Sequence, residues 1–295
     1  MGVICSRVRT EEKQIFRALQ ERGVPFQRID VRDLTFSVSS TDHLPSLGEG
    51  GVSVVLIRCL SHTRALYAAR MLEHEGVRTI NPYQAIATCG DKVLTSMAME
   101  EQGVPTARTA IALSQKAALA AVERMGYPVV VKPPVGSWGR LMAKVNDREA
   151  AEAILEHKAR DGGARNGNTT FYVQDYVHKP DRDIRTLVVG DETIYAVYRR
   201  SSHWITNTAR GGETSVCPVT PEIDRISLAA ARAVGGEVVA VDLLEMPPTG
   251  DGGPTLLVNE VNHTPEFHGA TGATDVDVAG RMVEYVLAAR ERGTG

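Results

Sequence analysis

Short apolar runs alternate with amphipathic stretches in the N-terminal part of the sequence, and this order restricts the possible folds more than any other feature. Strand-like and helical stretches follow one another at 2–5, 10–22, 25–31, 52–58, 62–75 and 77–81. Strands that alternate with helices of this length usually lie parallel in one sheet, because the helix carries the chain back to the edge where the next strand starts. The pattern predicts an α/β fold that begins with a small parallel sheet.

The remainder of the chain mixes helical and strand-like patterns. We predict helical segments at 83–102, 115–125, 147–158, 221–234 and 277–292. Predicted strands lie at 106–113, 127–133, 141–145, 171–177, 184–190, 193–200, 238–244 and 255–262. The Gly-rich run before 141–145 makes that stretch the return strand of a hairpin.

The composition is that of an ordinary soluble globular protein, with 43% hydrophobic and 23% charged residues. A net charge of −3 gives no indication of nucleic-acid binding. Because no apolar stretch is long enough to span a bilayer and the N-terminus lacks a secretion-signal pattern, we expect a cytoplasmic protein without a membrane partner. The cysteines are scattered, with no C-x-x-C pair, and favour reduced structural thiols over a zinc site: Cys5, Cys59, Cys89 and Cys217.

The segment VVVKPPVGSWGR places Lys132 at the end of an apolar strand, directly before a loop of small residues. The strand would fix the ammonium group, and Gly136, Ser137 and Gly139 would let backbone N–H groups approach phosphate oxygens closely. An ordinary lysine before a hairpin turn explains the segment equally well. The segment is not a Walker A sequence, and no G-x-G-x-x-G follows the first strand, so dinucleotide binding is unsupported.

Two further segments could contact a nucleotide. In CGDKVLTS, Lys92 stands near the start of a helix, where a cation is unfavourable unless an anion also binds. In QDYVHKPDRDIR, backbone groups at the exit of a strand could bond a purine edge, and Asp183 could hold a ribose or a basic partner. A solvated lysine and a plain charged turn are the alternatives.

Acidic and amide side chains interrupt two apolar strands near the C-terminus. Asp242 lies in VVAVDLLE, and Glu260 and Asn262 lie in LLVNEVN. An unpaired charge in such a strand costs several kcal/mol, so a salt bridge, a catalytic site or a metal ion must compensate. Glu260 and Asn262 share one face of their strand. Three oxygen donors from two neighbouring strands favour Mg²⁺, although one buried acid alone is often structural.

The segment YRRSSHWITNTARGG carries a basic, amide-bearing set of side chains: Arg199, Arg200, Asn207 and Arg210. Such groups suit recognition of carboxylates and stabilisation of a phosphorylated intermediate. A solvent-exposed loop is the alternative. No order of Ser, His and Asp indicates a nucleophilic triad, and His203 and His263 favour structural or hydrogen-bonding roles.

Taken in order, these segments resemble the ATP-grasp ligases. CGDK, PVVVKPPVGSWGR, RDIR, YRRSSHWITNTARGG and VNEVNHTPEF are similar to the LysX-type lysine-biosynthesis ligases of the RimK-like branch. NEVN alone marks the superfamily, whereas SHWITNTARGG together with NEVNHTPEF is specific to the subgroup. The resemblance runs from the first strand to the last helix. It implies an ATP-grasp fold with a pre-ATP-grasp domain at 1–88, a central lid domain at 89–178 and a C-terminal α+β domain at 179–295.

The resemblance also implies an activity. Such enzymes use ATP and Mg²⁺ to join the α-amino group of α-aminoadipate, or of glutamate in the arginine pathway, to the C-terminal glutamate side chain of a small acidic amino-group carrier protein. An acylphosphate is the intermediate. Alternatives are a glutamate ligase acting on a ribosomal or other protein tail, a carrier-protein ligase of secondary metabolism, and a non-catalytic ATP-binding regulator. Homo-oligomers, dimers or tetramers, are common among these relatives.

The resemblance assigns a role to each candidate residue. Arg199 and Asn207 would steady the acylphosphate, Arg185, Arg210 and Glu266 would contact substrate, and Asp242, Glu260 and Asn262 would coordinate Mg²⁺. The residues that would bind ATP are Lys92, Lys132, Gly136, Ser137, Gly139, Asp175, Tyr176 and Asp183.

Two departures from the family pattern bear on this assignment. Asp175 stands where relatives often have Glu. The stretch HGATGATD after Phe267 replaces a more polar or basic one, near where the amino-acid side chain is expected. As the amino-acid substrate, the sequence slightly favours α-aminoadipate over glutamate.

Overall fold

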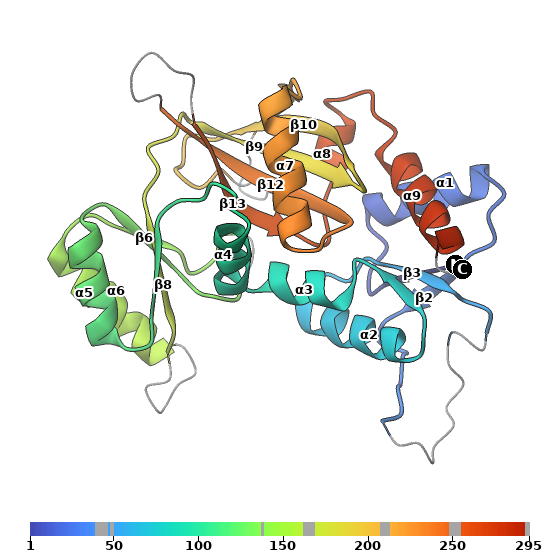
Figure 1. The fold of residues 1–295 in the computed structure, drawn as a ribbon, viewed down its shortest axis with the longest axis horizontal. Coiled ribbons are helices and arrows are strands. Elements are labelled where there is room, and N and C mark those ends of the chain that lie inside the picture. Colours follow the sequence, from blue (N-terminus) through green and yellow to red (C-terminus); the bar gives the residue numbers. More distant parts are fainter. Residues whose placement is uncertain are drawn as a thin grey trace.

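The computed structural model describes residues 1–38, 47, 50–136, 139–161, 169–206, 213–247 and 255–292, and the structural statements below concern these residues. Their strands form three sheets, of four, five and four strands. The N-terminal sheet and the sheet covered by α5 and α6 lie at opposite ends of the molecule, with the five-stranded sheet between them (Figure 1). The predicted domain boundaries stay a prediction.

The N-terminal sheet is parallel, as predicted, with the strand order β2-β1-β3-β4. Its two central strands are buried along their whole length, which explains why they read as continuous apolar runs. The elements are β1 (Gly2–Cys5), α1 (Thr10–Glu21), β2 (Gln27–Asp30), β3 (Val54–Ile57), α2 (His62–His74) and β4 (Arg78–Ile80).

The segment predicted as helical at 83–102 is two helices, α3 (Tyr83–Gly90) and α4 (Lys92–Glu101). Asp91 separates them in an extended conformation, and its carboxylate accepts hydrogen bonds from the backbone N–H groups of Val93 and Leu94 at 2.8 and 3.4 Å. An aspartate that caps a new helix in this way starts α4 at Lys92.

A second, antiparallel sheet has the order β5-β8-β6-β7 and carries two helices on one side. The predicted hairpin is confirmed by the antiparallel pairing of β6 with β7. The elements are β5 (Thr109–Ala112), α5 (Gln115–Met125), β6 (Val129–Lys132), β7 (Ala143–Val145), α6 (Arg148–Asp161) and β8 (Phe171–Asp175).

The five-stranded C-terminal sheet is antiparallel and has the order β11-β10-β9-β12-β13. Two elements of this part of the chain were not predicted from the sequence, the strand β11 and the helix α8. The edge strand β11 is largely exposed and its ETSVC sequence lacks an apolar alternation, and the helix α8 has only four residues. The elements are β9 (Arg182–Val189), β10 (Glu192–Arg200), β11 (Glu213–Cys217), α7 (Pro221–Ala233), β12 (Val238–Met246), β13 (Thr255–Asn262), α8 (His268–Thr271) and α9 (Val278–Arg292).

One apolar core joins the N-terminal sheet to the C-terminal sheet. Val3 and Leu56 of the N-terminal sheet pack in the same buried cluster as Leu187 and Val197 of the C-terminal sheet and Val283 of α9. Helices α1 and α9 lie side by side over this junction (Figure 1). The shared core therefore fixes the parallel sheet against the C-terminal unit.

Within the described ranges, no helix combines the length and the apolar composition that a membrane span requires.

Candidate active site

A cavity of about 330 Å³ is lined by residues of the five-stranded sheet, of the β5-β8-β6-β7 sheet and of the segment that follows β3 of the N-terminal sheet. It brings together most of the residues singled out from the sequence: Lys132, Gly136, Gly139, Asp175, Tyr176, Asp183, Arg185, Arg199, Asp242, Glu260, Asn262 and Glu266. Lys92 lies beside it, with its Nζ 3.8 Å from Glu260 Oε1. Ser137, Asn207 and Arg210 lie outside the described residues.

Lys132 ends β6 inside the cavity and is almost completely buried. Its ammonium group donates hydrogen bonds to Gln174 Oε1 at 2.7 Å and to Asn259 Oδ1 at 3.1 Å. The amide nitrogen of Gln174 in turn donates to the hydroxyls of Thr109 and Tyr172, both at 3.1 Å. These hydroxyls orient the Gln174 amide with its oxygen toward Lys132, so Gln174 is a positioning residue for the lysine.

Lys92 contacts the loop after β6. Its ammonium group donates to the carbonyl of Gly136 at 2.7 Å, and its backbone N–H donates to the carbonyl of Pro134 at 2.9 Å. Gly139 has a φ of +63°, and a Cβ there would come within 2.9 Å of Ile205, so this position needs glycine. The two predicted lysines thus approach one end of the cavity from different elements.

Two cavity-lining residues at the exit of β8 are held by cations. The carboxylate of Asp175 accepts two hydrogen bonds from the Arg108 guanidinium, each at 3.0 Å. The Lys144 ammonium lies 3.7 Å from the centre of the Tyr176 ring, and Trp204 meets the same ring edge-on at 6.1 Å. The Asp175 carboxylate is therefore bound to Arg108, and its backbone N–H donates to the Arg108 carbonyl at 2.9 Å. The aromatic rings are the contacts that this wall offers to a planar base.

Charged side chains alternate across the C-terminal sheet inside the cavity. Arg185 donates two hydrogen bonds to Asp242, at 2.7 and 2.8 Å, and Arg199 Nη2 lies 3.2 Å from the same carboxylate. Arg199 also donates two hydrogen bonds to Asp183, at 2.6 and 2.7 Å. The arginines hold the pKa of Asp242 below its ordinary value, at about 2, against the opposing effect of burial. This carboxylate is ionised at neutral pH.

The predicted metal ligands occupy neighbouring positions, because Asp242 of β12 pairs with Glu260 of β13. The amide nitrogen of Asn262 is buried without a hydrogen-bond partner among the described residues. Two carboxylates and an amide oxygen are hard donors of the kind that Mg²⁺ prefers. A carboxylate has about four acceptor positions, so the arginine contacts of Asp242 leave room for a cation. The residues present therefore fit Mg²⁺.

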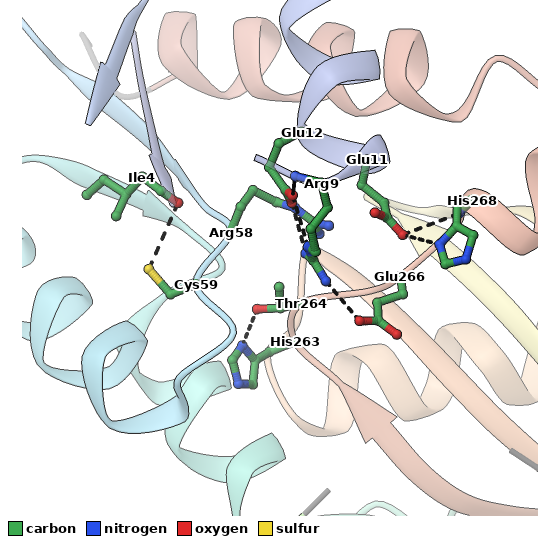
Figure 2. A network of polar contacts seen from close by, with 10 residues as sticks. All are labelled: Ile4, Arg9, Glu11, Glu12, Arg58, Cys59, His263, Thr264, Glu266 and His268. Carbon is green, nitrogen blue, oxygen red and sulfur yellow. Dashed lines mark hydrogen bonds and ion pairs between the residues drawn. The ribbon is translucent and has the colours of Figure 1, made fainter. Parts of the chain in front are cut away.

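Glu266 lies in the loop after β13, and its ion-pair partner, Arg9, comes from the N-terminal unit, where it directly precedes α1. Its Oε1 accepts a hydrogen bond from Arg9 Nη1 at 2.8 Å. Figure 2 shows Arg9 between Glu266 and Glu12, and Arg58 reaching the same Glu12 carboxylate. The predicted substrate residue is thus bound to Arg9, which shares Glu12 with Arg58, and the sequence singled out neither arginine.

The comparisons with known proteins decide the family. The RimK-like ATP-grasp domain model matches residues 89–286, and the LysX preATP-grasp domain model matches residues 1–88. This chain belongs to the RimK-like ATP-grasp family. The predicted ATP-grasp fold is confirmed, and the chain is an ATP-dependent carboxylate–amine ligase.

Curated relatives align over nearly the full length of this RimK-like ligase. It is 38% identical to a glutamate–LysW ligase (ArgX) of Sulfurisphaera tokodaii, over 96% of each chain. It is 30% identical to an α-aminoadipate–LysW ligase (LysX) of Saccharolobus solfataricus, over 94% of this chain and 96% of the relative. The resemblance to the LysX-type ligases, predicted from the sequence, is confirmed as well.

Solved structures confirm the fold. A RimK-domain ATP-grasp protein of Sphaerobacter thermophilus superposes with a TM-score of 0.72 at 22% identity, covering 97% of this chain and 100% of that one. The ATP-grasp ligase PsnB, solved with a minimal precursor, Mg and ADP, gives a TM-score of 0.71 at 18% identity, covering 99% and 98%. ATP-grasp ligases in general use ATP and Mg²⁺.

Several cavity residues of this RimK-like ligase were missed from the sequence. Gln174 and Asn259 hold Lys132, and His62 lines the wall nearest the N-terminal sheet, together with His263, for which the sequence predicted a structural or hydrogen-bonding role. Gln174 and Asn259 both stand in strands already singled out, QDYV and VNEVN, but Asn259 directly precedes Glu260, so strand alternation alone would put these two side chains on opposite faces. The pairing of β12 with β13 shifts register beside Asp242, and no local sequence pattern indicates this shift. For His62 no such pattern exists in the sequence.

The buried ammonium of Lys132, if it binds ATP as predicted from the sequence, leads us to expect that ATP binding depends on pH. Burial lowers the pKa of Lys132 from its ordinary value to about 8, so the free enzyme loses this cation as the pH rises through 8. Since a neutral amine no longer attracts phosphate, we expect the KM for ATP to increase above about pH 8 and to be flat below it. Initial rates at varied ATP and saturating concentrations of the other substrates, from pH 6.5 to 9.5, measure this. A Lys132→Arg variant, which keeps its charge, should not show the increase.

The pair of Asp183 with Arg199 predicts a stability effect. Both side chains are buried, and Asp183 also accepts a hydrogen bond from the Thr206 hydroxyl at 2.5 Å. Asp183→Asn leaves the Arg199 charge with one buried carboxylate instead of two, so we expect the free energy of unfolding to fall by about 3 kcal/mol. Urea unfolding followed by circular dichroism measures the change. A loss below about 0.5 kcal/mol, the size of an ordinary surface substitution, would contradict the structural role given to this pair.

Proposed function

We propose that this RimK-like ligase joins the α-amino group of an acidic amino acid to the side-chain carboxylate of the C-terminal glutamate of a LysW-type carrier protein. The observation that carries the proposal is the alignment over 96% of the chain with a ligase named for glutamate and LysW. The cavity supports it chemically, since it places cations for phosphate oxygens beside carboxylates and an amide suited to Mg²⁺.

The reaction requires two steps. In the first, an oxygen of the carrier carboxylate attacks the γ-phosphorus of ATP, the bond to the β-phosphate oxygen breaks and ADP leaves. In the second, the neutral amine attacks the acyl carbon, phosphate leaves and the amine loses a proton. Bound Mg²⁺ would screen the negative charge of the phosphates.

In the first step the residues of this chain act by position and charge. Lys132 and Lys92 would attract phosphate oxygens, with Lys132 fixed by Gln174 and Asn259. Asp175 and Tyr176 would line the site of the adenine. Glu260 and Asn262, with Asp242, would hold the metal. No covalent enzyme intermediate is needed, because orientation and charge neutralisation suffice for phosphoryl transfer.

Arg199 has the geometry of a group that stabilises charge on the acylphosphate. It is buried, and bonds to Asp183 and Asp242 fix its guanidinium on the cavity wall. A donor fixed before the reaction avoids the cost of reorganisation when charge develops. Asn207 would steady the acylphosphate together with Arg199, and Arg185 and Arg210 would contact the substrate. Asp183 fixes Arg199 and would also contact the nucleotide.

Glutamate and α-aminoadipate are both candidates for the amino acid. The sequence alone favoured α-aminoadipate, whereas the ligase named for glutamate shares 38% of its residues with this chain and the one named for α-aminoadipate shares 30%. Because of this difference we place glutamate first and keep α-aminoadipate as the second candidate.

The test uses the purified enzyme with ATP, Mg²⁺, the LysW-type carrier and each amino acid separately, followed by intact-protein mass. We expect the carrier to gain the mass of one amino-acid residue, with the higher kcat/KM for glutamate. A carrier truncated by its C-terminal residue is the control and should gain nothing. No gain with either amino acid would refute the proposed function, and repeated additions would indicate a protein-tail glutamate ligase instead.

A further inference from the structure

Arg9, Glu12 and Arg58 form a buried triad beside the cavity. Glu12 Oε1 accepts hydrogen bonds from Arg9 Nη2 at 2.9 Å and from Arg58 Nε at 3.1 Å. Glu12 Oε2 accepts from both the backbone N–H and Nε of Arg9, at 3.0 Å each. The Glu12 and Arg58 side chains are 0% and 1% exposed. One carboxylate therefore serves two guanidinium groups, and the triad has a net charge of +1.

Glu266 neutralises this surplus charge from the C-terminal side. It binds the remaining terminal nitrogen of Arg9, and its side chain is 36% exposed whereas that of Arg9 is 19% exposed. The neighbouring Glu11 does not perform this role, because it is bound to His268 at 2.6 Å (Figure 2). Glu266 lines the cavity and is the most exposed anion in contact with the triad, so it is the anion that a ligand can most readily replace.

Arg58 retains unused hydrogen-bond donors. Its Nη1 and Nη2 atoms are buried and have no hydrogen-bond partner among the residues that the structure describes. Its guanidinium carbon lies over the ring of Phe267, 5.7 Å from the ring centre. Buried polar groups without partners are costly and rare in native structures. The four N–H bonds at these two nitrogens suit the planar, two-point binding of a carboxylate.

The position of the triad is that of a ligand site in an α/β sheet. Arg58 directly follows β3, and Arg9 follows β1, so both stand at the carboxyl edge of the parallel sheet, where such folds bind ligands. The residues just beyond Arg58, Cys59 and Leu60, line the cavity. The facing loop is fixed, since the Asn81 amide donates to the carbonyl of His263 at 2.7 Å.

We propose that Arg9 and Arg58, held by Glu12, bind a carboxylate of the acidic amino-acid substrate, which displaces Glu266 from Arg9. This inference rests on the proposed function and adds the residues that recognise the acidic amino acid. Glutamate and α-aminoadipate each have two carboxylates, and the experiment separates them. Glu266, released from Arg9, remains in the cavity wall close to the substrate.

The test compares the KM for glutamate in Arg9→Gln, Arg9→Lys and Arg17→Gln. We expect Arg9→Gln to raise this KM about 10- to 100-fold, the value of hydrogen bonds to a charged group, with kcat and the KM for ATP changed less than about threefold. Arg9→Lys should recover part of the loss. Arg17→Gln, an exposed residue of the same helix, should behave as the wild type. The capping bond from the Arg9 backbone to Glu12 survives in each variant.

Glutamine, as an alternative substrate, identifies which carboxylate is bound. If the triad binds the side-chain carboxylate, Arg9→Gln reduces the preference of the enzyme for glutamate over glutamine. If it binds the α-carboxylate, both KM values rise together. A rise in the KM for carrier or ATP alone, or a parallel loss of kcat and thermal stability with the glutamate KM unchanged, would overturn the inference in favour of a structural clamp.

Glu266→Gln tests the displacement separately. Since glutamine is a weaker competitor for Arg9, we expect the KM for glutamate to fall about threefold or more. An unchanged or higher KM would contradict displacement.

Direct binding separates failure of this site from failure of the proposed function. Titration calorimetry with ADP, Mg²⁺ and glutamate or α-aminoadipate, without carrier, should show binding by the wild type and about tenfold weaker binding by Arg9→Gln. Binding that depends on Arg9 without any ligation would refute the proposed function and preserve the carboxylate site. Ligation with normal glutamate KM in Arg9→Gln would do the reverse.

Discussion

Replacing Glu260 with glutamine is expected to slow ligation by about a thousandfold or more, which corresponds to about 4 kcal/mol of transition-state stabilisation. Glu260 pairs with Asp242 across the sheet and shares a strand face with Asn262, so it supplies the central carboxylate of the proposed metal site. Glutamine keeps the volume of the side chain but removes the charge that a divalent cation requires. The rate is measured by carrier mass against time at saturating substrates.

The same substitution should leave the protein folded. Glu260 is 30% exposed, and its ion pair with Lys92, at 3.8 Å, is long, so we expect the free energy of unfolding to change by less than about 1 kcal/mol. Glu192→Gln, which removes an exposed carboxylate at the start of β10, is the matched control and should retain full activity. If Glu260→Gln ligated at a near-normal rate, the metal assignment would be wrong.

Replacing Lys132 with glutamine is expected to lower kcat/KM for ATP about 100- to 1,000-fold, the usual effect of removing one preorganised donor to a developing anion. The glutamine side chain can still bond to Gln174 and Asn259, so the packing around the site survives. Because the substitution removes a buried cation, it should not reduce stability. Steady-state kinetics over a range of ATP concentrations, together with thermal unfolding, measure both effects.

Lys116→Gln is the control for this substitution, since Lys116 is an exposed residue of α5. A Lys132→Gln enzyme with an unchanged KM for ATP and an unchanged kcat would contradict the phosphate role. It would leave the lysine as a structural partner of Gln174 and Asn259.

The strands that carry the cavity were predictable because their sequences are unusual. Glu260 and Asn262 interrupt an apolar run with the period of a strand, and Lys132 ends another directly before a glycine-containing loop. Such conflicts between burial and polarity are informative, since they must be compensated by a partner or a ligand. The N-terminal parallel sheet was predictable for a different reason, the regular exchange of strand and helix patterns.

Other parts of the site depend on long-range contacts that no local pattern contains. Arg9 meets Glu266 only because one apolar core holds the N-terminal sheet against the C-terminal unit. The two arginines around Asp242 come from neighbouring strands whose register is set by the whole sheet. The break at Asp91 had a local signal, a capping aspartate, but the helical pattern on both sides concealed it.

The central claim is that this cavity activates a carrier carboxylate by phosphorylation before the amine attacks. The most direct test uses a carrier whose C-terminal glutamate side chain is labelled with heavy oxygen, together with ATP, Mg²⁺ and glutamate. The account predicts that the phosphate released during ligation contains one labelled oxygen, transferred from the carrier, and that ADP is the other product. Ligation that releases only unlabelled phosphate would contradict the acylphosphate.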